Sequence, residues 1–152
     1  MTKIIIDTNI AFSAMLNINS RIGQILINGS KHYSFFSPEF IRSEIFEHQN
    51  KIKKIAKIND EEFHETYELI IKNVIILNHA VIPIEIFKQA LKICGSIDID
   101  DTAFVALTDY LKGQLWTGDK FLIEGLTKKG FKQIVTTEEL YLDFLNKDRI
   151  KR

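Results

Sequence analysis

The sequence predicts a single α/β domain built around a central parallel β-sheet. Short runs of β-branched and aromatic residues alternate along the chain with longer segments of helical periodicity. The first run, residues 4–6, is all isoleucine, which is typical of a strand buried on both faces of a parallel sheet. A length of 152 residues suits one compact core and leaves little room for two.

Five β-rich runs mark the expected strands of this sheet. They cover residues 4–6, 33–36, 74–77, 115–117 and 134–135. A strand-to-helix turn at Asp7, Thr8 and Asn9 follows the first run. The alternation with helices favours parallel strands joined by helical crossovers.

Start and stop signals place several helices between these strands. Pro38 and Pro83 precede apolar residues at helical spacing, and Asn59 precedes three acidic residues, as expected of an N-cap. Gly95 ends the helix that follows Pro83, and Gly113 ends the helix that begins after residue 101. A last helix opens at residues 136–139 and runs toward residue 145.

Composition excludes several classes of protein. The chain has 20 basic and 20 acidic residues, so any nucleic-acid surface is local rather than a global basic field. The single cysteine, Cys94, forms no internal disulfide and is expected to be buried. The sequence shows neither a secretory leader nor a long apolar stretch, so we expect a cytoplasmic protein that does not enter a membrane.

Aspartates gather where the predicted strands end and helices begin. Asp7 follows the first strand, Asp119 follows the fourth, and Asp98, Asp100 and Asp101 open a helix. Ligands of parallel α/β sheets bind at the carboxyl ends of the strands, so these acids are expected to share one edge. Each aspartate also has an ordinary explanation as a helix N-cap or turn residue.

Clustered carboxylates repel one another unless a cation lies between them. Hard oxygen ligands select Mg2+ or Mn2+, and the chain has no Cys/His set suited to zinc. Such a pocket suits phosphodiester hydrolysis, in which one ion activates water and a second stabilises the leaving oxygen. The four histidines are scattered without a motif and are expected to be structural or solvated.

Three segments resemble the acidic motifs of the PIN-domain family in the same order: IIIDTN at residues 4–9, DIDDTAFVAL at residues 98–107 and LWTGDK at residues 115–120. The resemblance spans nearly the whole chain and implies a three-layer α/β/α sandwich. It also implies a Mg2+- or Mn2+-dependent nuclease, most often a ribonuclease. By position, Asp7, Asp101 and Asp119 become catalytic metal ligands, with Asp98 as a fourth aspartate.

The family also places a glutamate on the helix after the second strand. Glu44 has the expected position, with Glu39 and Glu47 as alternatives on the same helix. Asp100 is expected to be a bystander of its cluster. Short polar side chains beside the acids are expected to orient them, and these are Thr8, Asn9 and Thr117.

Local basic clusters are candidate contacts for a nucleic-acid backbone. The first comprises Lys51, Lys53, Lys54 and Lys57, and the second comprises Lys128, Lys129 and Lys132. Lys120 either contacts phosphate or pairs with a nearby acid. The expected nuclease domain covers residues 1–146, followed by a basic C-terminal tail, residues 147–152, that is expected to be frayed.

The resemblance further implies partners. Many small bacterial members are toxins of toxin–antitoxin pairs, in which an antitoxin protein blocks the acidic pocket, and homodimers occur. RNA is the expected substrate, cut to leave a 5′-phosphate and a 3′-hydroxyl, with DNA open as an alternative. A non-catalytic PIN-like scaffold that binds RNA or protein is the first rival function, although the acid set is complete.

A phosphoaspartate protein, either a phosphatase of the haloacid-dehalogenase type or a receiver, is the second rival. Asp7 is followed by Thr8 and Asn9, without the second aspartate two residues on that the phosphatase motif requires. A receiver needs an additional acidic pair near the first strand and an acceptor aspartate after a middle strand, which the sequence does not offer.

Overall fold

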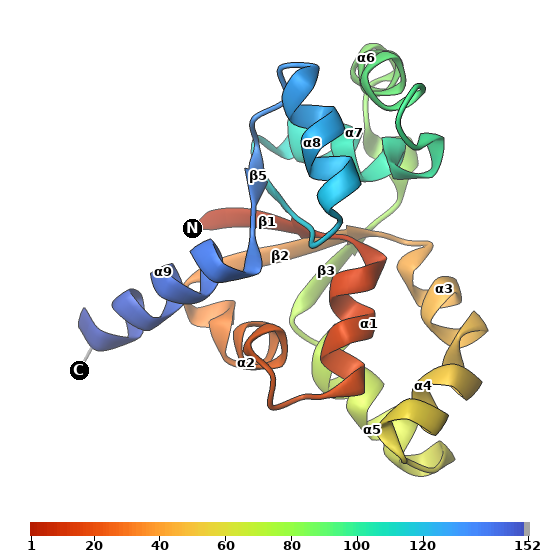
Figure 1. Cartoon of the computed structure of the whole chain (residues 1–152), viewed down its shortest axis with the longest axis vertical. Coiled ribbons are helices and arrows are strands. Elements are labelled where there is room, and N and C mark those ends of the chain that lie inside the picture. The colour runs from red at the N-terminus through yellow and green to blue at the C-terminus, as the bar shows by residue number, and fades with distance from the viewer. Residues whose placement is uncertain (151–152) are drawn as a thin grey trace.

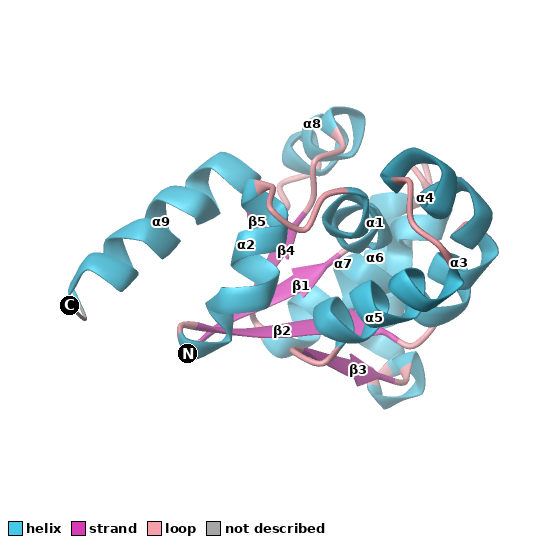
Figure 2. Ribbon diagram, turned by 90° about the horizontal axis from the view of Figure 1, so that it is seen from below, coloured by secondary structure: helices cyan, strands magenta, loops and turns pink. Residues whose placement is uncertain are grey.

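A five-stranded parallel sheet forms the centre of the computed structural model, which describes residues 1–150 (Figures 1 and 2). The strands are β1 (Thr2–Ile6), β2 (Tyr33–Pro38), β3 (Val74–Leu77), β4 (Gln114–Trp116) and β5 (Ile134–Val135). All five lie where the sequence predicts them, to within two residues at each end.

The strand order is β3-β2-β1-β4-β5, so β1 lies between β2 and β4. The chain first winds outward from β1 to β3 and then returns to the other side of β1. The strand order therefore reverses between β1 and β4. Parallel α/β sheets bind ligands at such a reversal.

Two helical layers cover the sheet and complete the predicted three-layer sandwich. One layer comprises α1 (Thr8–Leu16), α2 (Arg21–Asn28), α3 (Ile41–Glu47), α4 (Gln49–Ala56), α5 (Asp60–Ile71) and α9 (Thr137–Ile150). The other comprises α6 (Ile84–Cys94), α7 (Thr102–Leu111) and α8 (Lys120–Lys128). Short 3-10 helices are η1 (Gly29–Lys31), η2 (His79–Val81) and η3 (Ile99–Asp101).

The alternation of side chains along β1 divides the hydrophobic core between the two faces. Ile4 and Ile6 pack in the core under α1, α2 and α5, whereas Ile5 packs in the core under α6, α7 and α8. Both cores need an apolar β1, because a central strand of a parallel sheet is buried on both faces. Cys94 lies fully buried in the second core, as expected.

Local signals in the sequence set most helix ends. Asn59 and Glu62 form a reciprocal capping box at the start of α5, and Pro83 directly precedes α6. Gly113 does not itself end its helix as predicted. The helix α7 already ends at Leu111, and Lys112 takes the left-handed conformation (φ 55°). A Cβ atom on Gly113 would lie 2.6 Å from the carbonyl oxygen of Lys3, so glycine is needed here for the close approach to β1.

The last helix is longer than predicted. The expected boundary at residue 146 falls within α9, which projects beside α2 and continues to Ile150 (Figure 1). Asp148 binds Lys31 at 2.8 Å and His32 at 2.9 Å, so residues 147–150 continue a packed helix. Residues 151 and 152 of the predicted tail lie outside the described residues. Within residues 1–150, no helix is both long and apolar enough to cross a bilayer.

Candidate active site

The carboxyl ends of β1 and β4 bring two of the predicted acids together. Ile6 pairs with Trp116 in the parallel register, and the backbone N–H of Asp7 donates to the carbonyl oxygen of Trp116 at 3.4 Å. Asp7 and Asp119 therefore leave adjacent strands at the same edge of the sheet. This is the position where the strand order reverses.

A pocket of about 350 Å3 opens at this edge. It collects side chains from β1, α1, α3, α4, η3, α7 and the β4–α8 loop. Its lining comprises Asp7, Thr8, Asn9, Phe12, Glu44, His48, Lys51, Asp98, Asp100, Asp101, Phe104 and Asp119. All four residues predicted to be catalytic thus border one pocket, together with Asp98 and Asp100.

Asp7 and Asp119 cap helices and face the pocket at the same time. Oδ1 of Asp7 accepts the N–H of Ile10 at 3.0 Å, and Oδ1 of Asp119 accepts the N–H of Leu122 at 3.1 Å. The capping explanation of these aspartates is therefore correct. It is also compatible with a second role, because capping engages one of the two carboxylate oxygens.

Thr117 contacts both of these residues, Asp119 through its backbone and Asp7 through its carboxylate. Its side chain is fully buried, and its hydroxyl oxygen accepts the N–H of Asp119 at 3.2 Å. The same hydroxyl hydrogen-bonds the carboxylate of Asp7, which favours the ionised form and lowers its pKa. Thr117 thus contacts the acids that follow β1 and β4.

Two carboxyl groups of the pocket, Asp101 and Asp7, have raised pKa values. Burial raises the pKa of Asp101 to about 7, with further contributions from the negative charges of Asp98, Asp7 and Asp119. Burial also raises the pKa of Asp7, which is only 5% exposed, against the opposing hydrogen bond from Thr117. A cation between these groups would favour their ionised forms.

Glu44 is the glutamate of α3 that reaches the pocket. Glu39, the first alternative, lies before α3 and pairs with His79 at 3.3 Å, and Glu47 is exposed without bordering the pocket. The positional argument for Glu44 thus agrees with the geometry. The role of Glu44 in chemistry stays a prediction.

The chemistry of the pocket fits a hard divalent cation. Within residues 1–150, no three acidic, histidine or cysteine side chains are already arranged as a set of metal ligands. Mg2+ needs only one or two carboxylates, because it retains several water ligands. The hydroxyl oxygen of Thr8 borders the pocket, is buried and has no hydrogen-bond partner among the described residues, so a hydrated ion would give it one.

The lysines predicted to contact nucleic acid do not lie together in the structure. Lys51 borders the pocket, whereas Lys53 pairs with Asp60, and Lys54 is exposed away from the lining. Lys120 begins α8, also outside the lining. Of the second cluster, Lys129 borders a different pocket between α6, α7 and α8.

Several residues of the pocket were not expected from the sequence. Phe12, His48 and Phe104 line it, and Asp100 does so although it was expected to be a bystander. Helical spacing offered a signal for two of them, because Phe12 lies four residues after Thr8 and His48 lies four residues after Glu44. His48 is exposed and hydrogen-bonded to the backbone, as expected of a solvated or structural histidine, and it borders the pocket as well.

The chain is similar to known proteins in both sequence and structure. A family model described as the PIN domain matches residues 5–143. No curated protein matches the sequence. A similar solved chain belongs to VapBC2 from Rickettsia felis bound to a DNA fragment from its promoter, with a TM-score of 0.64 and 12% identity over 88% of this chain and 96% of that chain. At this identity the likeness shows a shared fold.

Proposed function

The chain belongs to the PIN-domain family, and from this premise we propose that it is a divalent-metal-dependent ribonuclease. One observation carries the proposal: carboxylates from β1, α3, η3 and the β4–α8 loop border one pocket at the reversal of strand order. Burial, together with the negative charges of its acidic neighbours, raises the pKa of Asp101 to about 7, which supports a pocket suited to a cation.

The proposed metal ligands are Asp7, Asp98, Asp101 and Asp119. Mg2+ or Mn2+, when bound, would supply charge neutralisation and activation of water for attack on an RNA phosphodiester. Asp7 and Asp119 keep fixed positions because each caps a helix, and Thr117 orients both. Glu44, on the opposite wall, would orient the attacking water, and the products would carry a 5′-phosphate and a 3′-hydroxyl.

Cleavage of a panel of single-stranded and structured RNAs, with matched DNAs, tests this function. The purified protein is assayed with Mn2+, Mg2+ or EDTA beside Asp7→Asn and Asp119→Asn, which retain helix-capping side chains. We expect cleavage that requires the metal and falls at least 100-fold in both variants. Equal residual cleavage by wild type and both variants would indicate a contaminating nuclease.

A non-catalytic scaffold is the alternative function. Such a protein would bind RNA or protein through the same fold without needing a metal. Calorimetric titration of Mn2+ separates the two functions, because the nuclease requires binding that Asp7→Asn and Asp101→Asn weaken. Absence of both metal binding and cleavage would favour the scaffold.

A toxin–antitoxin role is supported by the shared fold with VapBC2, whose structure contains a bound promoter fragment. In this role a partner protein would cover the acidic pocket of the present chain. Induced expression in a bacterial host tests the toxic activity, which should arrest growth for wild type and spare it for Asp7→Asn. Size-exclusion chromatography with light scattering of the purified chain tests the proposed homodimer.

A further inference from the structure

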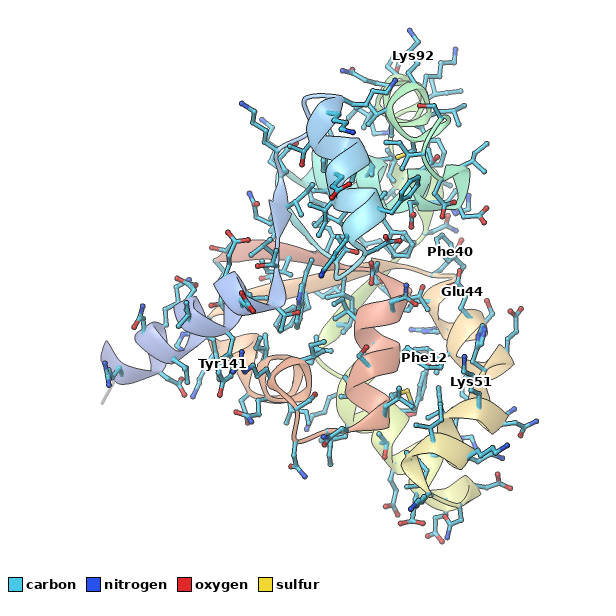
Figure 3. All side chains as sticks on the ribbon, viewed as in Figure 1. Phe12, Phe40, Glu44, Lys51, Lys92 and Tyr141 are labelled. Carbon is cyan, nitrogen blue, oxygen red and sulfur yellow. The ribbon has the colours of Figure 1, made fainter. Side chains whose placement is uncertain are left out.

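One wall of the pocket differs in chemistry from the rest. Phe12 of α1, His48 at the α3–α4 junction and Lys51 of α4 lie together there, beside Glu44. Figure 3 shows Phe12 extending from α1 toward the α3–α4 segment that carries Glu44 and Lys51. We call these three residues the aromatic–cationic wall. The carboxylates of Asp98, Asp101 and Asp119 come from other elements of the pocket.

Lys51 is the only lysine or arginine among the described residues that line the pocket. Despite its acidic surroundings, it forms no ion pair with a carboxylate of residues 1–150, and its Nζ lies 5.9 Å from the centre of the Phe12 ring. An exposed cation–π contact at this distance is weak. The ammonium group can therefore turn from the ring to a phosphate at little cost, because the lysine stem is flexible.

His48 fixes the aromatic part of the wall to the helix that carries Glu44. Its Nδ1 donates to the carbonyl oxygen of Glu44 at 2.8 Å, since a carbonyl only accepts. Its ring meets the Phe12 ring edge to face, with the centres 5.7 Å apart at 83°. The two rings thus form a supported aromatic surface within the pocket, and Phe12 also packs against the core.

An aromatic surface with an unpaired cation matches the two parts of a nucleotide, its base and its phosphate. Only an unpaired base exposes a face for stacking, because bases in a helix are already stacked on their neighbours. We propose that the aromatic–cationic wall is a nucleotide subsite, in which an unpaired base packs against Phe12 and His48 and the adjoining phosphate contacts Lys51. This proposal rests on the proposed ribonuclease function and assigns how its substrate is held.

Binding without catalysis tests the subsite separately from cleavage. The probes are a fluorescent 12-nucleotide oligoadenylate RNA, the same RNA with one abasic nucleotide at each position in turn, and a duplex of equal length. Affinity is measured by anisotropy in EDTA at several salt concentrations for wild type, Phe12→Leu, Phe12→Tyr, Lys51→Gln and Lys54→Gln. Thermal unfolding of each variant accompanies the titrations.

The subsite predicts a distinct effect for each variant. Phe12→Leu weakens binding about tenfold, whereas Phe12→Tyr retains affinity because it keeps a stacking ring. Lys51→Gln lowers the slope of log affinity against log salt by about 0.7, as loss of one phosphate contact in a single strand requires. Lys54→Gln, on the same helix outside the pocket, leaves the slope unchanged. The most sensitive abasic position weakens binding to wild type and not to Phe12→Leu.

Other outcomes separate the two proposals. If Phe12→Leu and Lys51→Gln bind RNA as tightly as wild type does, or lose affinity only in proportion to lost thermal stability, the subsite is overturned and the nuclease assay is unaffected. Preference for the duplex overturns it as well. If wild type binds no RNA in EDTA yet cleaves it with Mn2+, the subsite fails and the ribonuclease stands. Absence of both binding and cleavage overturns both.

Discussion

The two groups of aspartates in the pocket are held in different ways. The strand-end pair, Asp7 and Asp119, follows adjacent strands, and each residue caps a helix. The helix-entry segment, residues 98–101, forms the short 3-10 helix η3, whose cap is Asp98, and Asp101 makes no side-chain cap to α7. The carboxylates of Asp7 and Asp119 thus stabilise local structure. The carboxylate of Asp101 instead adds a negative charge beside other negative charges.

This difference indicates how the site balances stability against function. At the strand-end pair, the carboxylate shape is needed for folding as well as for chemistry, so asparagine is a milder substitution than alanine. At Asp101 the ionised form opposes folding until a cation or a proton arrives. Loss of the capping oxygen at the strand-end pair should therefore lower stability, whereas loss of the charge at Asp101 should raise it.

The largest expected effect on stability comes from Thr117→Val, which removes the hydroxyl that contacts both members of the strand-end pair. The N–H of Asp119 loses its acceptor and the carboxylate of Asp7 loses a donor, so stability should fall by about 1–3 kcal/mol. Activity should fall about 10- to 100-fold. Urea unfolding and cleavage rates measure these effects, and Thr117→Ser should restore both. Normal activity in Thr117→Val would show that the hydroxyl does not orient the acids.

Asp101→Asn should stabilise the metal-free protein at pH 8. The folded pKa of Asp101, about 7, exceeds the ordinary value of 3.8, so the folded state binds a proton that the unfolded state has released. Stability therefore falls as pH rises from about 4 to about 7, and the loss is complete above pH 7. Because Asp101 is partly exposed, we expect a gain on the order of 1–2 kcal/mol for the variant.

Urea unfolding in EDTA at pH 4.5 and pH 8 measures this gain. The difference between variant and wild type should be clearly smaller at pH 4.5 than at pH 8, because pH 4.5 lies only just above the unfolded pKa of 3.8, where the loss of stability begins. Asp109→Asn, on the exposed part of α7, is the matched control. A wild type as stable as Asp101→Asn at pH 8 would refute the expected cost of burying the ionised Asp101 beside other acids.

Asp7→Ala should be less stable than Asp7→Asn by about 1 kcal/mol, because alanine cannot accept the N–H of Ile10. Both variants remove the same charge, so their difference isolates the cap. Thermal and urea unfolding in EDTA measure it. Equal stability of the two variants would show that the side-chain cap of α1 adds nothing measurable to stability, and that Asp7 acts only in the pocket.

The smallest effect is expected at Gly125, through which α8 packs against the helix-entry segment. A Cβ atom there would lie 2.8 Å from Cδ1 of Ile97, the residue before Asp98. Gly125→Ala should lower cleavage a few-fold, while the better helix propensity of alanine offsets part of the clash. The double variant Gly125→Ala with Ile97→Ala removes Cδ1 and both Cγ atoms of residue 97, which would lie 2.8–2.9 Å from the new Cβ, and should recover activity. If it does not, the contact with Ile97 is not the cause.

Much of the fold could be predicted from local patterns. The apolar run at residues 4–6, the aromatic run at residues 33–36 and the capping residues Asn59 and Glu62 each carry their own structural signal. The short helices α2 and α4 were not singled out, although Ile22, Ile25 and Leu26 in α2 and Ile52 and Ile55 in α4 have helical spacing. Each helix has only eight residues, so the pattern covers about two turns. Their packing in the core under α1 and α5 stabilises them instead.

The acids of the site could also be found in the sequence, because each follows a strand or opens a helix in a pattern that resembles a known family. The aromatic–cationic wall could not be found from the sequence. Phe12 and Lys51 lie 39 positions apart in sequence, and each alone looks like an ordinary residue of an amphipathic helix. Their proximity arises from the packing of α1 against α4.

The sequence by itself determined the strands, the helix caps and the order of the acidic segments, because these depend on neighbouring residues and on the period of the side chains. Only the tertiary structure decided the strand order, which places Asp7 beside Asp119, and the burial that, with nearby charges, raises the pKa of Asp101. The tertiary structure also places Lys51, alone among four neighbouring lysines, at the pocket, together with His48. Such distinctions depend on distances in space, which a linear pattern does not contain.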